Sequence, residues 1–165
     1  MDVLVSGNGT LCWLGKTYSC RLGKNGLTKS KTEGDGCTPV GRFPVRCLYY
    51  RPDRVARPET ALPVYALVPS DGWCDDPRDS RYNQHVILPY PAGHEAMWRD
   101  DGLYDLIVVL GYNDAPPVSG KGSAIFFHVA HPEGKPTQGC VAVSLSDLQD
   151  IVQSLTTETY LTIQS

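Results

Sequence analysis

A histidine and a cysteine stand 12 positions apart beside two apolar runs, and together they could perform nucleophilic chemistry. The run 123–130 carries His128, and a second run opens with the pair Gly139-Cys140. A free thiol has a pKa of about 8.5, so a neighbouring imidazole is needed to raise the reactive thiolate fraction at neutral pH. The same imidazole can later pass the proton to a leaving amine. The spacing predicts a cysteine–histidine acyl-transfer centre.

Both residues also fit a structural interpretation. Phe126 and His128 would share one face of a strand, with Phe127 on the other, and a histidine among apolar neighbours is more often a hydrogen-bonded core residue. Cys140 alone could be a small buried apolar residue. The preceding Gly139 favours catalysis, because glycine permits a positive φ and close backbone approach, and adjacent N–H groups can form an oxyanion site.

The elements that must position this pair are short β-type runs between glycines and prolines, and they predict a mainly β, mixed α+β fold. The segment 31–41 is rich in turn residues, and 50–83 is predicted as a long excursion from the sheet, which is often functional. The length of 165 residues predicts a single domain over 1–165. The predicted strands are Val3–Val5, Leu11–Trp13, Thr17–Leu22, Phe43–Tyr49, Val64–Leu67, His85–Leu88, Tyr104–Leu110, Ala124–Ala130, Val141–Val143 and Tyr160–Ile163.

One or two short helices are predicted. Ser146 followed three residues later by Gln149 indicates a capping box with Ser146 as the N-cap. A weaker helix is predicted over Gly93–Asp101. The apolar residues of the main helix that would form its buried face are Leu148, Ile151, Val152 and Leu155.

Composition excludes several classes of function. The net charge is −3 and no long basic run is present, which argues against nucleic acid as a partner. No apolar stretch is long enough for a membrane span. The N-terminus lacks the basic start and apolar core of a signal peptide. Nothing in the sequence requires a cofactor, and the oligomeric state is left open.

Six cysteines invite a disulfide interpretation, yet a chain of this length does not need disulfides to fold, so we expect most to be reduced. Zinc is a minor alternative, with His128, His131 and Cys140 as one conceivable ligand set. His128 and His131 would point to opposite faces of a continuous strand, which argues against that set. We therefore predict no metal.

The chain resembles the L,D-transpeptidase catalytic domain family, the YkuD-like cysteine enzymes of bacterial peptidoglycan. Their signature, a strand histidine followed by Ser/Thr-His-Gly-Cys and an apolar residue, resembles His128 and the run 137–141 (Thr-Gln-Gly-Cys-Val). The segment 33–43 resembles the family's G-x-x-x-T-P-x-G-x-F turn into a core strand. The resemblance implies a β-sandwich or barrel-like mixed sheet with a small helix, and a location in the bacterial cell envelope or periplasm, with a cytoplasmic location or non-Sec export left open.

The resemblance also implies roles. Cys140 would be the acyl-forming nucleophile and His128 its base, oriented through a backbone carbonyl at Val129. The amides of Gly139 and Cys140 would lie near the oxyanion. The chain departs from the family in Gln138, which replaces a motif histidine that is usually not the base, and in a short His-to-Cys spacing.

A third departure is Ala142, which stands where many members carry Arg or Asn near a substrate carboxylate. Substrate placement must then come from elsewhere, and the segments 71–83 and 94–105 mix aromatic, basic and acidic side chains that suit a peptide. The alternative for each residue is a solvated loop with structural ion pairs. The expected substrate-binding residues are Thr137, Gln138, Tyr82, Asn83, His94, Trp98, Arg99 and Asp100.

The predicted function is acyl transfer on peptidoglycan stem peptides: Cys140 forms a thioester at an L-centre, a terminal D-residue leaves, and an amine acceptor resolves the thioester. Hydrolysis of the same bond, by an L,D-carboxypeptidase or endopeptidase, is one alternative. A non-catalytic peptidoglycan-binding module on the same fold is another, because the motif histidine is replaced by Gln138.

Overall fold

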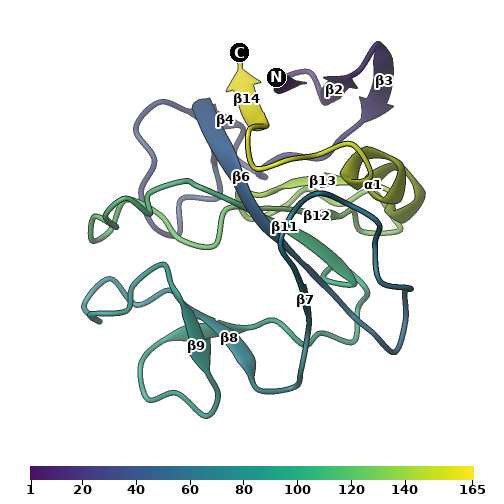
Figure 1. Cartoon of the computed structure of the whole chain (residues 1–165). Helices are drawn as coiled ribbons and strands as arrows, with labels where there is room; N and C mark the ends of the chain where they lie inside the picture. The colour runs from purple at the N-terminus through teal and green to yellow at the C-terminus, as the bar shows by residue number, and fades with distance from the viewer.

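The computed structural model describes residues 1–165, and its backbone is dominated by β-strands (Figure 1). The mainly β fold predicted from the sequence is confirmed. The elements are β1 (Asp2–Ser6), β2 (Thr10–Trp13), β3 (Lys16–Ser19), β4 (Leu27–Thr28), β5 (Thr38–Pro39), β6 (Gly41–Tyr50), β7 (Val64–Ala66), β8 (Asp71–Cys74), β9 (His85–Ile87), β10 (His94–Ala96), β11 (Leu106–Leu110), β12 (Phe126–Val129), β13 (Val141–Val143), α1 (Leu145–Val152) and β14 (Tyr160–Gln164).

A nine-stranded sheet curls into a nearly closed barrel. Its order is β13-β12-β11-β6-β14-β1-β2-β3, with β7 beside β6. Just beyond β3, Arg21 exchanges two backbone hydrogen bonds with Ala142 of β13, of 2.7 and 2.9 Å, so the two ends of the sheet meet. The terminal strands β1 and β14 are neighbours in the sheet and run parallel, so the N- and C-termini lie at opposite ends of this strand pair.

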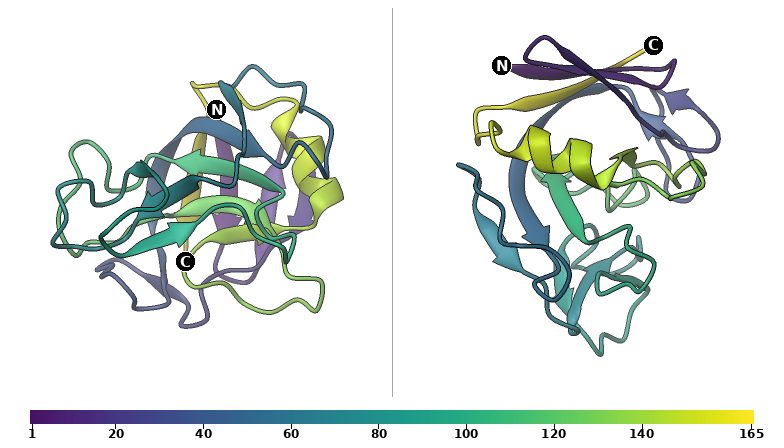
Figure 2. Two further views of the ribbon diagram at one scale, coloured as in Figure 1. Left: turned by 90° about the horizontal axis from the view of Figure 1, so that it is seen from below. Right: turned by 90° about the vertical axis from the view of Figure 1, so that its right-hand side faces the viewer.

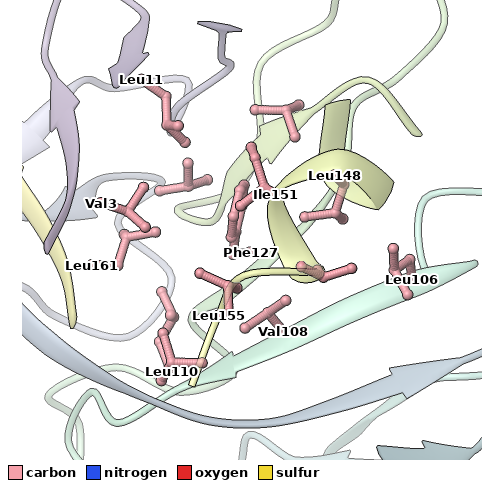
Figure 3. Close-up of a cluster of buried hydrophobic side chains, with 14 of the residues drawn as sticks. Val3, Leu11, Leu106, Val108, Leu110, Phe127, Leu148, Ile151, Leu155 and Leu161 are labelled. Atoms are coloured by element: carbon pink, nitrogen blue, oxygen red, sulfur yellow. The ribbon is translucent and has the colours of Figure 1, made fainter. Parts of the chain in front are cut away.

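The main core fills the interior of this curled sheet and is completed by α1. Leu148, Ile151 and Leu155 are fully buried and pack toward Phe127 of β12 and Val108 of β11 (Figure 3). Burial of a large aliphatic side chain stabilises a fold by roughly 1.5–3 kcal/mol, so the helix contributes through this apolar face. The buried face predicted from the sequence is confirmed, although Leu155 lies beyond the last helical residue.

The predicted N-cap of α1 is wrong. Ser144, not Ser146, caps the helix, and its Oγ accepts a hydrogen bond from the backbone N–H of Asp147. The chain leaves β13 in extended conformation, so the first serine after the strand already occupies the cap position. Ser144 also has an acidic residue three positions later, which interacts favourably with the helix N-terminus.

The excursion after β6 forms a second sheet that projects from the barrel (Figure 2). Its order is β10-β8-β9, all antiparallel. The predicted helix over Gly93–Asp101 is therefore wrong: His94–Ala96 is strand β10, because pairing with β8 satisfies its backbone groups and overrides local helix propensity. We refer to residues 51–105, between β6 and β11, as the inserted segment.

A second, smaller apolar cluster lies between the barrel and the inserted segment. Successive side chains of a strand point to opposite faces, so Phe127 enters the main core while Phe126 enters this cluster. The members of the second cluster are Leu67, Met97, Tyr104, Ile107, Val109, Ala124, Phe126 and Cys140. The alternation predicted for this strand is confirmed, although the strand itself begins at Phe126.

All six cysteines are free. No helix in the structure combines the length and apolarity needed to cross a membrane. Four strands escaped sequence-based prediction, and each is only two to four residues long: β4, β5, β8 and β10.

The contribution of α1 can be measured with a neighbouring pair of variants. Leu148→Ala should lower the free energy of unfolding by about 2–5 kcal/mol, because it removes a fully buried side chain and leaves a cavity. Gln149→Ala, one position along on the exposed face, should change it by less than about 0.5 kcal/mol. Urea unfolding followed by circular dichroism provides both values. Equal losses in the two variants would contradict this packing.

Candidate active site

Cys140 and His128 open into one cavity of about 340 Å³. They come from adjacent parallel strands, His128 from β12 and Cys140 from the residue before β13. The barrel and the loop 131–139 form one wall, and the inserted segment forms the other. The cavity is lined by Glu95, Arg99, Leu103, Tyr104, Ala124, Ile125, His128, His131, Lys135, Pro136, Thr137, Gln138, Gly139 and Cys140.

A tight turn presents Cys140, and it requires glycine at position 139. Gly139 has φ +141°, and a Cβ there would lie 2.8 Å from the Cys37 carbonyl oxygen. Any other residue would combine backbone strain with a clash. The positive φ expected at this glycine is present.

Thr137 closes the same turn with its side chain. Its Oγ1 donates to the Cys140 carbonyl at 2.7 Å and accepts from the Gly139 N–H at 3.1 Å. The Gly139 amide is thereby occupied, whereas the Cys140 N–H has no protein acceptor. Of the two amides expected near an oxyanion, only that of Cys140 is unpaired.

The upstream Thr-Pro segment supports this turn from behind. Thr38 is fully buried, and its Oγ1 accepts from the Gly23 N–H at 2.8 Å. The neighbouring Leu22 and Lys24 exchange backbone hydrogen bonds with Thr137, of 2.9 and 2.8 Å. The two motifs separated by about 100 residues in the sequence therefore build one structure.

The Cys140 thiol is held by the backbone that precedes β12. Sγ donates to the Ala124 carbonyl at 3.2 Å and accepts from the Phe126 N–H at 3.3 Å. Burial raises the pKa of the thiol to about 12, and the nearby Glu95 charge adds to the effect. The resting thiol is protonated at neutral pH.

The His128 imidazole is fixed by a backbone carbonyl. Nδ1 lies 2.8 Å from the Val129 oxygen, and because a carbonyl only accepts, Nδ1 carries the proton and Nε2 is the basic nitrogen. This is the backbone contact implied by the family resemblance. Burial lowers the pKa of His128 to about 4, with the Val129 carbonyl opposing the shift, so the ring is neutral near pH 7.

No hydrogen bond joins Cys140 to His128 in the structure, because the thiol is directed to Ala124 instead. The pair is a neutral thiol and a neutral imidazole, both buried, at one cavity. Such a pair can do base-assisted nucleophilic chemistry if the thiol turns from the Ala124 carbonyl toward Nε2 as a substrate enters.

A polar wall from the inserted segment faces this pair. The Tyr104 hydroxyl donates to Glu95 Oε1, and its ring packs edge-on against His128 with centroids 5.3 Å apart. The Arg99 guanidinium lies 4.9 Å from the Tyr104 ring centroid and 2.5 Å from Asp101 Oδ2. Burial raises the pKa of both Glu95 and Tyr104. The wall thus offers one carboxyl and one guanidinium to the cavity.

Three of the predicted substrate-binding residues line the cavity: Thr137, Gln138 and Arg99. His94, Trp98 and Asp100 do not. Trp98 packs under the Arg51 guanidinium at 3.6 Å, and the Asp100 side chain is fully exposed.

Tyr82 and Asn83 also lie outside the cavity lining, buried behind its wall. The Tyr82 hydroxyl donates to Glu33 Oε1 at 2.6 Å and accepts from the Gly122 N–H at 2.9 Å. The structure therefore places both residues where they support the chain before β12 rather than where they face the cavity.

Sequence reasoning did not select Glu95 and Tyr104, although both lie within a segment expected to form a wall. The signal that could have found them is the strand-like alternation at 94–96, which the helical interpretation obscured. No group of three or more His, Cys, Asp or Glu side chains is arranged to hold a metal ion.

A family model described as the L,D-transpeptidase catalytic domain, YkuD, matches residues 3–163. No curated protein matches the chain. A similar solved structure is the helical cell shape determining protein Pgp2 from Campylobacter jejuni, at 14% identity and a TM-score of 0.47, covering 99% of this chain and 47% of that one. A point mutant of Pgp2 gives the same identity and TM-score. The chain thus spans about half the length of these structures.

The effect of Glu95 on the thiol can be measured by alkylation. Glu95→Gln removes a negative charge that raises the pKa of Cys140, so more thiolate should form at a given alkaline pH. Iodoacetamide should then label Cys140 severalfold faster, where tenfold would correspond to one pKa unit. Peptide mass spectrometry identifies the labelled residue. Glu158→Gln, on an exposed turn, is the control and should match wild type; unchanged labelling in Glu95→Gln would contradict the proposed charge effect.

His128 should make the fold sensitive to acid. Its folded pKa is about 4 against an ordinary 6.5, so between these values the unfolded chain binds a proton that the folded chain does not. Stability should fall as the pH drops through this window, by up to about 3 kcal/mol. The loss of stability with falling pH in this window should disappear in His128→Asn and persist in His131→Asn. Urea unfolding at several pH values tests the difference, and an unchanged slope in His128→Asn would refute it.

Proposed function

The chain belongs to the L,D-transpeptidase catalytic domain family, and from this membership we propose that residues 1–165 form one catalytic domain that performs cysteine-dependent acyl transfer on peptidoglycan stem peptides in the bacterial cell envelope. The observation that supports the proposal most is that Cys140 and His128, from adjacent strands, share one cavity with an unpaired Cys140 N–H.

In the proposed mechanism, Sγ of Cys140 attacks the carbonyl carbon of the amide between an L-centre and a D-residue. The thiol proton passes to Nε2 of His128, and the oxyanion that forms accepts a hydrogen bond from the Cys140 N–H. His128 then gives the proton to the leaving amine of the D-residue as the C–N bond breaks, which leaves a thioester. The amine of a second stem attacks the thioester carbon and loses a proton to His128. An amide bond forms as the C–S bond breaks, and the departing sulfur takes that proton from His128 to regenerate the thiol.

The timing of proton transfer follows from burial. Without substrate, a separated thiolate–imidazolium pair is disfavoured, because the pKa of the thiol is about 12 and that of the imidazole about 4. We therefore propose that the proton moves as the C–S bond forms. Substrate also displaces water, which strengthens the interaction of the Cys140 N–H with the developing charge.

Substrate placement is assigned to the polar residues that line the cavity. Arg99 suits a carboxylate and Glu95 an ammonium group of a stem peptide, and Gln138 can both donate and accept hydrogen bonds at the rim. Hydrolysis remains the second outcome of the same chemistry, with water resolving the thioester.

A binding module is the second candidate function, and one observation favours it: the thiol donates to Ala124 and makes no hydrogen bond to His128. In that case the cavity would hold a stem peptide without reaction. Thiol reactivity separates the two, because a catalytic Cys140 should react with a carbapenem faster than the other five cysteines do.

Intact-mass spectrometry with a tetrapeptide donor tests the proposal. Wild type should carry an acyl adduct, and so should Cys20→Ala, which removes a buried cysteine of the main core. Cys140→Ala should carry none, and His128→Asn should form the adduct about 10²–10⁴-fold more slowly. An adduct on Cys140→Ala would refute the assignment.

Muropeptide products then define the reaction. Cross-linked dimers would indicate transfer, trimmed monomers would indicate hydrolysis, and unchanged muropeptides that nevertheless bind the protein would indicate the binding module.

A further inference from the structure

Asn83 is 5% exposed and joins three segments through its side chain. Oδ1 accepts from the Ala124 N–H at 3.0 Å and from Trp73 Nε1 at 2.9 Å. Nδ2 donates to the carbonyls of Tyr112 and Asn113 at 2.9 and 2.8 Å. A side-chain amide offers two lone pairs and two hydrogens, so Asn83 is fully used and has no capacity left for a substrate.

Ala124 connects this residue to the thiol. It has φ +52°, a left-handed conformation that disfavours residues with a Cβ. Its N–H donates to Asn83 Oδ1, and its carbonyl accepts a hydrogen bond from the Cys140 thiol. Two residues later, the N–H of Phe126 donates to the same sulfur. The direction of the Ala124 carbonyl, and with it the direction of the S–H bond, depends on the Asn83 contact.

We propose that Asn83 is a positioning residue for Cys140: by holding Ala124 in its left-handed conformation, it fixes the backbone acceptor that orients the thiol at the cavity floor. The proposal deepens the proposed function, and rests on it only where activity is the readout.

Through the hydrogen bond between Asn83 and Ala124, the inserted segment influences the position of the thiol on the barrel. Asn83 and Trp73 belong to the inserted segment, whereas Ala124 leads into β12. The Trp73 ring also packs edge-on against Phe126, with centroids 5.1 Å apart. Strand β8 and the loop that follows it therefore contact both residues that hydrogen-bond the sulfur, Ala124 and Phe126.

A matched pair of variants isolates the effect of the hydrogen bond between Asn83 and Ala124. Asn113 also has a positive φ, +50° against +59° for Asn83, and its side chain also makes three loop hydrogen bonds, but none to Ala124. Asn83→Gly and Asn113→Gly each remove such a side chain without backbone strain. Thermal unfolding of both variants reports any loss of stability, and the comparison is made where both are folded.

Thiol alkylation is the first readout. A hydrogen bond from S–H to a carbonyl favours the neutral thiol. Releasing Ala124 should therefore lower the pH midpoint of Cys140 alkylation by roughly half a pH unit to one pH unit. The charged and titratable groups near the sulfur, which are unchanged in both variants, are Lys31, Glu95, Arg99, Tyr104 and His128. Asn113→Gly should keep the wild-type midpoint.

Steady-state kinetics provide the second readout. With the sulfur misplaced, kcat for acyl transfer should fall by about 10²-fold in Asn83→Gly while KM stays near the wild-type value. A wild-type midpoint and kcat in folded Asn83→Gly would overturn the proposal and leave the proposed function intact. If the pH midpoint of alkylation shifts in Asn83→Gly but the wild-type protein shows no acyl transfer, the positioning role of Asn83 is upheld and the proposed function is refuted.

Amide hydrogen exchange in the wild-type protein is a test that needs no variant. The Ala124 N–H lies outside any strand, and only Asn83 accepts its hydrogen bond. It should therefore exchange at least about 10²-fold more slowly than an unbonded loop amide. Rapid exchange of Ala124 would overturn the proposal even if Asn83→Gly failed to fold.

Discussion

Burial of Cys140 in the second apolar cluster, and of His128 beside it, is the constraint on which the rest of the site depends. The main core is complete without them, whereas the inserted segment covers the opposite face of β11 and β12 and removes both side chains from water. Desolvation disfavours charge on either group. Each side chain then needs a backbone partner, which the Ala124 carbonyl supplies for the thiol and the Val129 carbonyl for Nδ1 of the imidazole.

A neutral resting pair has chemical consequences. The thiolate is the form that is oxidised and alkylated, so a thiol held protonated is protected while the cavity is free. The same low polarity strengthens any hydrogen bond made to a charge that develops during reaction. A buried neutral pair is therefore compatible with an efficient nucleophile, provided that the sulfur is correctly aimed before the substrate arrives.

Local sequence patterns predicted those features that depend on local periodicity. Alternation around His128 separated Phe126 from Phe127 correctly, and Gly139 has the positive φ expected of it. The pattern failed where long-range pairing overrides propensity, as at 94–96, which is a strand because β8 lies beside it. Tyr82 and Asn83 were expected to face substrate, but no local signal distinguishes a polar residue that faces a cavity from one that ties two loops together.

The departure at Ala142 has a geometric explanation. Ala142 pairs in register with His128 on the adjacent parallel strand, so the two side chains lie on the same face, and Ala142 is fully buried. A long polar side chain here would have to pack beside the imidazole, where its uncompensated polar atoms would be costly. With alanine in place, polar contacts to any ligand of this cavity fall to the other lining residues, among them Arg99 and Glu95 of the inserted segment and Gln138 of the loop 131–139.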